Sequence, residues 1–113
     1  MKIVQISDCH LFADSSKIGY NNINPFLSLE RVLAEVKIQS PDVLLVTGDI
    51  SGDGSGQSYQ HFSHLIQGAQ IGCRIGIIPG NHDNQQQLAA NIVEQYLWLH
   101  HPRMVLPNQW HIH

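Results

Sequence analysis

The sequence predicts an α/β fold built on a parallel sheet, because short apolar runs alternate with helical patterns along the chain. Residues 2–7 alternate apolar and polar side chains. Residues 43–46 and 75–78 are continuous apolar runs that end in glycine-containing turns, as buried parallel strands do. A helical pattern follows each of these segments. The order strand, helix, strand, helix, strand, helix favours right-handed crossovers onto one sheet.

The helical patterns have identifiable starting points. Asn24 suits an N-cap and Pro25 suits the first helical position, so the first helix should begin there. Its apolar stripe comprises Phe26, Leu29, Val32, Leu33 and Val36. A second helix after the Ser/Gly-rich turn 51–56 would carry Tyr59, Phe62, Ile66 and Ala69 on one side. A third helix after Asp83 would carry Leu88, Ile92, Tyr96 and Leu99, and short strands are expected at 104–106 and from 109.

Composition excludes some classes of partner. A chain of 113 residues with 42% hydrophobic residues is large enough for one domain with a real core. The net charge of −3 and the lack of a Lys/Arg cluster argue against nucleic acid as a partner. No signal-peptide pattern or bilayer-length apolar run occurs, so we expect a cytoplasmic protein without a membrane partner. Cys9 and Cys73 lie in apolar stretches without Cys-x-x-Cys spacing, which indicates core residues.

Polar side chains follow all three predicted strands. They are Asp8 and His10 after the first, Asp49 after the second, and Asn81, His82 and Asp83 after the third. Ligands bind beyond the carboxyl ends of strands in open parallel sheets, so these side chains are expected to converge. Oxygen and nitrogen donors without a thiolate suit divalent metal ions. The sequence therefore predicts a metal site, although Asp83 could alternatively be only the N-cap of the third helix.

In order and spacing, Asp8-x-His10, Gly48-Asp49 and Gly80-Asn81-His82-Asp83 resemble the first three signature blocks of the calcineurin-like metallophosphoesterases. The flanking residues resemble the bacterial class III 3′,5′-cyclic-AMP phosphodiesterases over nearly the whole chain. The resemblance implies the N-terminal portion of a two-sheet α/β sandwich. Residues 1–113 would then form a metallophosphoesterase domain that is incomplete at its C-terminus.

The resemblance also implies roles for these residues. Two divalent ions are expected as cofactors, Fe or Mn first and Zn or Mg as alternatives. Asp8 and His10 would bind the first ion, Asp49 would bridge both ions, and Asn81 would bind the second. His82 would protonate the leaving group as the catalytic acid, assisted by Asp83 or a neighbour. The expected substrate is a small nucleotide, a 3′,5′-cyclic nucleotide that is hydrolysed to a 5′-nucleotide.

The chain departs from the family pattern downstream, where further metal-binding histidines are required. His100-His101-Pro102 and His111-Ile112-His113 imitate those blocks in letters only, and we expect neither to supply ligands. Residues 1–113 alone are therefore expected to be weakly active or inactive, and to self-associate through an uncovered sheet face. Two alternatives stay open: an enzyme for other nucleotide conjugates, and a non-catalytic scaffold with the same fold.

Overall fold

A computed structural model describes residues 1–81, 83–91 and 97–98 of the chain. They contain a parallel sheet of four strands in the order β1-β2-β3-β4. The strands are β1 (Ile3–Ser7), β2 (Val43–Thr47), β3 (Arg74–Ile78) and the short β4 (Leu97–Trp98). The α/β class and the three predicted strands are confirmed, each to within a residue or two of the expected bounds.

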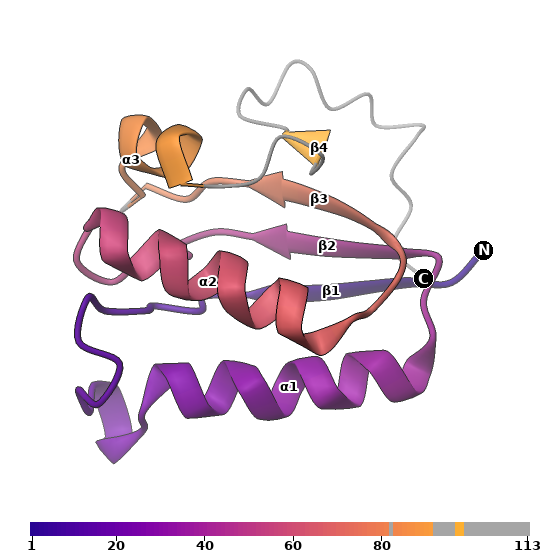
Figure 1. The fold of residues 1–113 in the computed structure, drawn as a ribbon, viewed down its shortest axis with the longest axis horizontal. Coiled ribbons are helices and arrows are strands. Elements are labelled where there is room, and N and C mark those ends of the chain that lie inside the picture. Colours follow the sequence, from indigo (N-terminus) through magenta and orange to yellow (C-terminus); the bar gives the residue numbers. More distant parts are fainter. Residues whose placement is uncertain (82, 92–96, 99–113) are drawn as a thin grey trace.

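Three α-helices connect or follow the strands (Figure 1). They are α1 (Pro25–Gln39), α2 (Gly56–Ala69) and α3 (Gln85–Asn91), and a short 3-10 helix, η1 (Tyr20–Asn22), precedes α1. Each new strand is added on the same side of the preceding one, so crossovers of one hand place their helices on one face of the sheet. Accordingly, α1 and α2 pack side by side. None of the described helices combines the length and apolar character that a membrane span requires.

The core lies between these helices and the sheet. Leu44 and Val46 of β2 belong to one buried cluster with Leu33 of α1 and Phe62 of α2. The core also includes Leu11 and Ile50 from the loops after β1 and β2, which are 1% and 0% exposed. These loops are therefore anchored in the core immediately beside the carboxyl ends of the strands.

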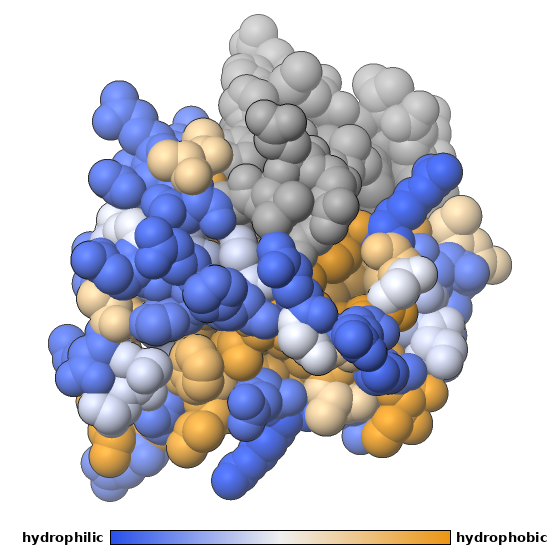
Figure 2. Space-filling model, in the orientation of Figure 1, coloured by the Kyte–Doolittle hydropathy of each residue, from blue (hydrophilic) through white to orange (hydrophobic). Residues whose placement is uncertain are grey.

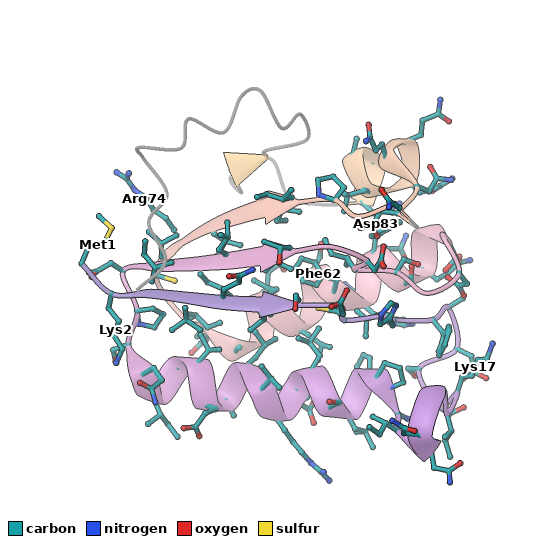
Figure 3. All side chains as sticks on the ribbon, turned by 180° about the vertical axis from the view of Figure 1, so that it is seen from behind. Met1, Lys2, Lys17, Phe62, Arg74 and Asp83 are labelled. Atoms are coloured by element: carbon teal, nitrogen blue, oxygen red, sulfur yellow. The ribbon has the colours of Figure 1, made fainter. Side chains whose placement is uncertain are left out.

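The opposite face of the sheet carries the alternate residues of each strand. On this face Gln5 Nε2 of β1 donates a hydrogen bond to Thr47 Oγ1 of β2 over 2.9 Å. Seen from behind in Figure 3, the strands stand in front of α2. No described helix covers this face.

The predicted start of α1 is present, and α2 has a side-chain cap that the sequence analysis did not predict. Asn24 accepts a hydrogen bond from the backbone N–H of Leu27 (3.1 Å) and Pro25 is the first residue of α1. Ser55 caps α2 by accepting from the N–H of Ser58. Both helices therefore begin at residues that satisfy otherwise unpaired backbone donors.

Two sequence predictions were wrong in detail. Val32 was expected on the buried stripe of α1 but is 39% exposed, because it lines an open groove beside β1. The third helix was expected to extend to Leu99, but Leu97 and Trp98 pair with β3. Backbone N–H and C=O groups along the edge of β3 are available to pair with another strand, and a helical pattern in the sequence gives no sign of such pairing. Ile92, Tyr96, Leu99 and the strands expected at 104–106 and from 109 lie outside the described residues.

Apolar side chains also reach the surface on the helical side of the molecule. Figure 2 shows apolar atoms at the surface of this side, whereas the surface over α3 is mainly hydrophilic. Leu27, Val32 and Ile38 of α1 are among the exposed apolar residues. The buried stripe of α1 is thus narrower than the sequence suggested, and consists of Leu29, Leu33 and Val36.

Adjacent positions of α1 should differ sharply in their contribution to stability. Leu33→Ala removes a side chain that is 1% exposed and should lower the free energy of unfolding by about 2–5 kcal/mol. Val32→Ala, the matched control, should lower it by about 1 kcal/mol or less. Urea unfolding of both variants, followed by circular dichroism, measures the difference. Equal losses would mean that the core does not lie where the structure puts it.

Candidate metal centre

Three of the four predicted metal ligands meet at the carboxyl end of the sheet. Within the described residues, a ligand atom of each of Asp8, His10 and Asp49 lies within 4.8 Å of the other two. His10 Nε2 is 4.0 Å from Asp8 Oδ1, and both side chains are about half exposed. Asp49 is partly buried. One imidazole and two carboxylates are therefore within reach of a common point that solvent can enter.

The backbone at this cluster is unusual. Asp8, His10 and Asp49 have φ values of 57°, 50° and 36°, in the left-handed region that residues with a side chain rarely occupy. Hydrogen bonds hold them there: His10 N–H donates to Asp49 O (2.9 Å), and Leu11 N–H to Ile50 O (2.9 Å). Strained backbone conformations concentrate at functional sites, and this clustering is an independent sign of one.

The loop after β3 is pressed against the loop after β2. A Cβ atom placed on Gly80 would lie 2.5 Å from Asp49 Oδ1 and 2.8 Å from Gly48 Cα, and would also meet the backbone nitrogen of Asp49. Only glycine allows this approach. Asn81, the predicted fourth ligand, is the next residue and is exposed, so its backbone lies at the same end of the sheet as the cluster.

Asp83 has a different environment from the three clustered residues. Its Oδ1 accepts hydrogen bonds from Ser51 N–H (3.0 Å) and the Tyr59 hydroxyl (2.9 Å). Its Oδ2 accepts from Ile50 N–H (3.1 Å) and Gly80 N–H (2.8 Å). The side chain that caps α3 is instead Asn84, whose Oδ1 accepts from Gln87 N–H. Asp83 thus binds the loop after β2 to the loop after β3.

Cys9 lies between two candidate ligands but is itself a packing residue. It contacts the core, as the sequence predicted for both cysteines. Burial raises the pKa of the Cys9 thiol to about 12, and the negative charges of Asp83 and Asp8 act in the same direction. A protonated thiol is a poor metal ligand, since metals bind the thiolate.

His82 is the remaining predicted site residue, whereas no ligand role was predicted for the other histidines of the chain apart from His10. His82 lies outside the described residues, as do His100, His101, His111 and His113. His61 of α2 packs: its Nε2 is 2.9 Å from Ala13 O and its ring meets Phe26 edge to face. Asp8 and His10 also line a mainly apolar, open groove of about 530 Å³ with Phe12, Leu29 and Val32.

Sequence reasoning missed Tyr59 as a residue connected to the site. The sequence showed it only as part of the apolar stripe of the second helix, and it is indeed completely buried. No local pattern could show that its hydroxyl reaches Asp83.

The clustered side chains fit a divalent cation. Two atoms bound to one ion at the usual distances of about 2.0–2.2 Å cannot lie more than about 4.4 Å apart. The observed limit of 4.8 Å is close enough that small side-chain rotations would complete a common site. All donors are oxygen or nitrogen, as magnesium, manganese, iron and zinc accept.

A sequence model of the calcineurin-like phosphoesterase family matches residues 1–110, and the chain belongs to this family. Membership confirms the resemblance drawn from the three motif blocks. It also fits the observed parallel sheet with helices, as the N-terminal part of that fold.

Curated relatives share substantial identity with the chain. A probable cyclic nucleotide phosphodiesterase from Pseudoalteromonas is 38% identical over 78% of this chain and 33% of its own length. A 3′,5′-cyclic adenosine monophosphate phosphodiesterase from Pseudomonas aeruginosa is 34% identical over 92% of this chain and 40% of its own length. A probable glycerophosphodiester phosphodiesterase from Arcobacter nitrofigilis is 30% identical over 87% and 35%. The matched part of the chain spans about a third of the length of the Pseudoalteromonas relative.

Adding one methyl group at Gly80 should disturb the metal centre. Gly80→Ala must push Asp49 away from its present position, and a displaced ligand should weaken Mn²⁺ binding by about 10- to 100-fold. Titration calorimetry measures this in the complete protein. Gly68→Ala is the control, because nothing lies within 4 Å of its added Cβ, and it should bind as tightly as the wild type. Unchanged affinity in Gly80→Ala would show that the close approach of Gly80 to Asp49 is not needed for metal binding.

Proposed function

We propose that the protein is a metal-dependent phosphodiesterase that hydrolyses 3′,5′-cyclic nucleotides, cAMP among them, to 5′-nucleotides. The convergence of Asp8, His10 and Asp49 at the carboxyl end of the sheet carries this proposal. Support comes from the names of the relatives from Pseudoalteromonas and Pseudomonas aeruginosa. The proposal includes a cytoplasmic location, where the free thiols of Cys9 and Cys73 would stay reduced.

In this proposal the chain would supply ligands for two divalent ions. Fe or Mn is the first choice for these ions, and Zn or Mg is the alternative. Asp8 and His10 would hold one ion, Asn81 the other, and Asp49 would bridge them through its two carboxylate oxygens. Bound divalent ions neutralise the charge of a phosphodiester and lower the pKa of a water molecule. The exposure of Asp8 and His10 leaves room for the substrate phosphate.

His82 is proposed as the general acid. Hydrolysis forms a bond between phosphorus and a water oxygen and breaks the bond between phosphorus and O3′, so the departing O3′ needs a proton. An imidazole can donate it, because its ordinary pKa lies near neutral pH. Asp83 is proposed to assist by holding the loop: its carboxylate accepts from Gly80 N–H, two residues before His82.

The relative from Arcobacter nitrofigilis supports a second candidate substrate, a glycerophosphodiester. The same ligands could bind its phosphate, so the metal centre alone does not separate the two. Comparing turnover of cyclic AMP, other nucleotide conjugates and glycerophosphodiesters by one preparation distinguishes them. A non-catalytic scaffold would hydrolyse none of these substrates with added Mn²⁺.

Asp49 should be required for the metal content of the complete protein. Asp49→Ala should reduce bound metal from about two ions to about one or fewer and abolish most turnover, because the bridging carboxylate is lost. Elemental analysis and hydrolysis of cyclic AMP measure both effects. Asp14→Ala removes an exposed carboxylate outside the cluster and should change neither. An Asp49→Ala protein with full metal content and turnover would remove the bridging assignment.

His82 should affect chemistry more than metal binding. His82→Ala should lower kcat by roughly 10²–10⁴-fold, the usual contribution of a general acid, with metal content close to that of the wild type. His64→Ala, on α2, is the control and should retain kcat. Steady-state kinetics on cyclic AMP decide the matter, and an unchanged kcat in His82→Ala would exclude the acid role.

A further inference from the structure

A buried hydroxyl that the proposed chemistry does not use lies behind the metal centre. The side chain of Tyr59 of α2 is completely buried. Its hydroxyl donates to Asp83 Oδ1 (2.9 Å) and accepts from the backbone N–H of Asn84 (2.8 Å). Both partners belong to the loop between β3 and α3, 24 and 25 residues further along the chain.

The partner carboxylate connects two loops that carry candidate ligands. Through Ile50 and Ser51, Asp83 holds the residues directly after Asp49. Through Gly80 it holds the residue directly before Asn81. A change in the position of this carboxylate therefore alters the spacing of Asp49 and Asn81.

The helix that carries Tyr59 is fixed independently of this hydroxyl. Ser58 Oγ lies 2.6 Å from Ser51 Oγ, and both side chains are buried. Ser63 Oγ donates to Asn91 O of α3 over 2.9 Å. Loss of the Tyr59 hydroxyl alone would thus leave α2 anchored at both neighbouring elements.

We propose that Tyr59 is a positioning residue of the metal centre: acting through Asp83, its hydroxyl fixes the spacing between the Asp49 loop and the Asn81 loop. This inference rests on the proposed function, since it assigns a role in holding metal ligands. The hydroxyl and Ser51 N–H both donate to Oδ1 of Asp83, while the N–H groups of Ile50 and Gly80 donate to Oδ2, so the hydroxyl is the donor to this carboxylate that comes from α2. Removing a group that orients a metal ligand through hydrogen bonds commonly lowers metal affinity about 10- to 100-fold.

The phenol remains a donor over the working pH range. Burial raises the pKa of the Tyr59 hydroxyl well above its ordinary value; the Asn84 N–H opposes this shift and the charge of Asp83 adds to it. Tyr59 therefore stays protonated beside the carboxylate that it orients.

The test is Tyr59→Phe in the complete protein, which keeps the buried ring and removes only the hydroxyl. We expect Mn²⁺ affinity, measured by titration calorimetry, to fall about 10- to 100-fold. The electron paramagnetic resonance spectrum of bound Mn²⁺ should change as well. Ser63→Ala is the matched control, since it removes another buried hydroxyl from the same helix without touching a ligand loop. Its affinity and spectrum should match the wild type even if its thermal stability falls.

A double-mutant cycle tests whether Tyr59 acts through Asp83. Asp83→Asn should weaken Mn²⁺ binding by itself, and adding Tyr59→Phe to it should weaken binding no further. Circular dichroism shows whether Tyr59→Phe folds. If it does not fold, the Mn²⁺ affinity of Asp83→Asn is the test instead, and an Asp83→Asn protein that binds Mn²⁺ as tightly as the wild type overturns the proposal.

The possible results separate this inference from the proposed function. If Tyr59→Phe binds Mn²⁺ with the same affinity as the wild type, the positioning role is overturned and the proposed metal centre is unaffected. Equal losses in Tyr59→Phe and Ser63→Ala also overturn it, because they would reflect general destabilisation. A wild-type protein that binds no Mn²⁺ overturns both the proposed metal centre and the role of Tyr59 in it.

Discussion

Four donors converge on the carboxylate of Asp83, and the geometry of the candidate site depends on that convergence. Backbone groups beyond the ends of parallel strands have left the sheet and need other partners. Asp83 supplies partners for Ile50, Ser51 and Gly80, and charge-assisted hydrogen bonds of this kind are stronger than neutral ones. One side chain thereby accepts hydrogen bonds from the backbone directly after β2 and after β3, and it fixes the spacing between these two loops.

The contact between Gly80 and Asp49 follows from the same arrangement. With both loops bonded to one carboxylate, their backbones come so close that no Cβ fits at Gly80. On the other side, His10 N–H and Leu11 N–H bond to the backbone of the β2 loop, so the β1 loop is held as well. Left-handed conformations at Asp8, His10 and Asp49 cost about 1–3 kcal/mol each and persist only where the surroundings determine them. The outcome is a set of partly exposed side chains on a fixed backbone, which suits binding of a metal and a substrate.

Within the part of the chain that the structure describes, the helices pack on one face of the sheet. Leu11 and Ile50 insert from the site loops into the core under α1 and α2, so the packing of the helices and the placement of the ligands are mechanically linked. Tyr59 extends that link, because its ring belongs to the core and its hydroxyl to the Asp83 network. Membership in the calcineurin-like phosphoesterase family gives this arrangement its chemical interpretation.

Local and topological rules explain what could be predicted. Strand periodicity, the Asn24 cap and the Pro25 start depend on residues a few positions apart, and the structure agrees with them. The meeting of Asp8, His10 and Asp49 followed from the rule that parallel strands end at the same side of the sheet. The exposure of Val32 and the early end of α3 did not, because a groove and a neighbouring strand edge overrode the helical pattern.

The sequence by itself determined the α/β class, the identity of the candidate ligands and the family. Tertiary structure alone decided that Asp83 binds two loops together, that Gly80 touches Asp49 and that Tyr59 reaches the network. The physical reason is separation along the chain: the hydrogen bonds from Ile50 and Tyr59 to Asp83 span 33 and 24 residues. Hydrogen bonds between such distant groups leave no periodic trace in the sequence, since they form only where the packed sheet and helices bring the groups within about 3 Å.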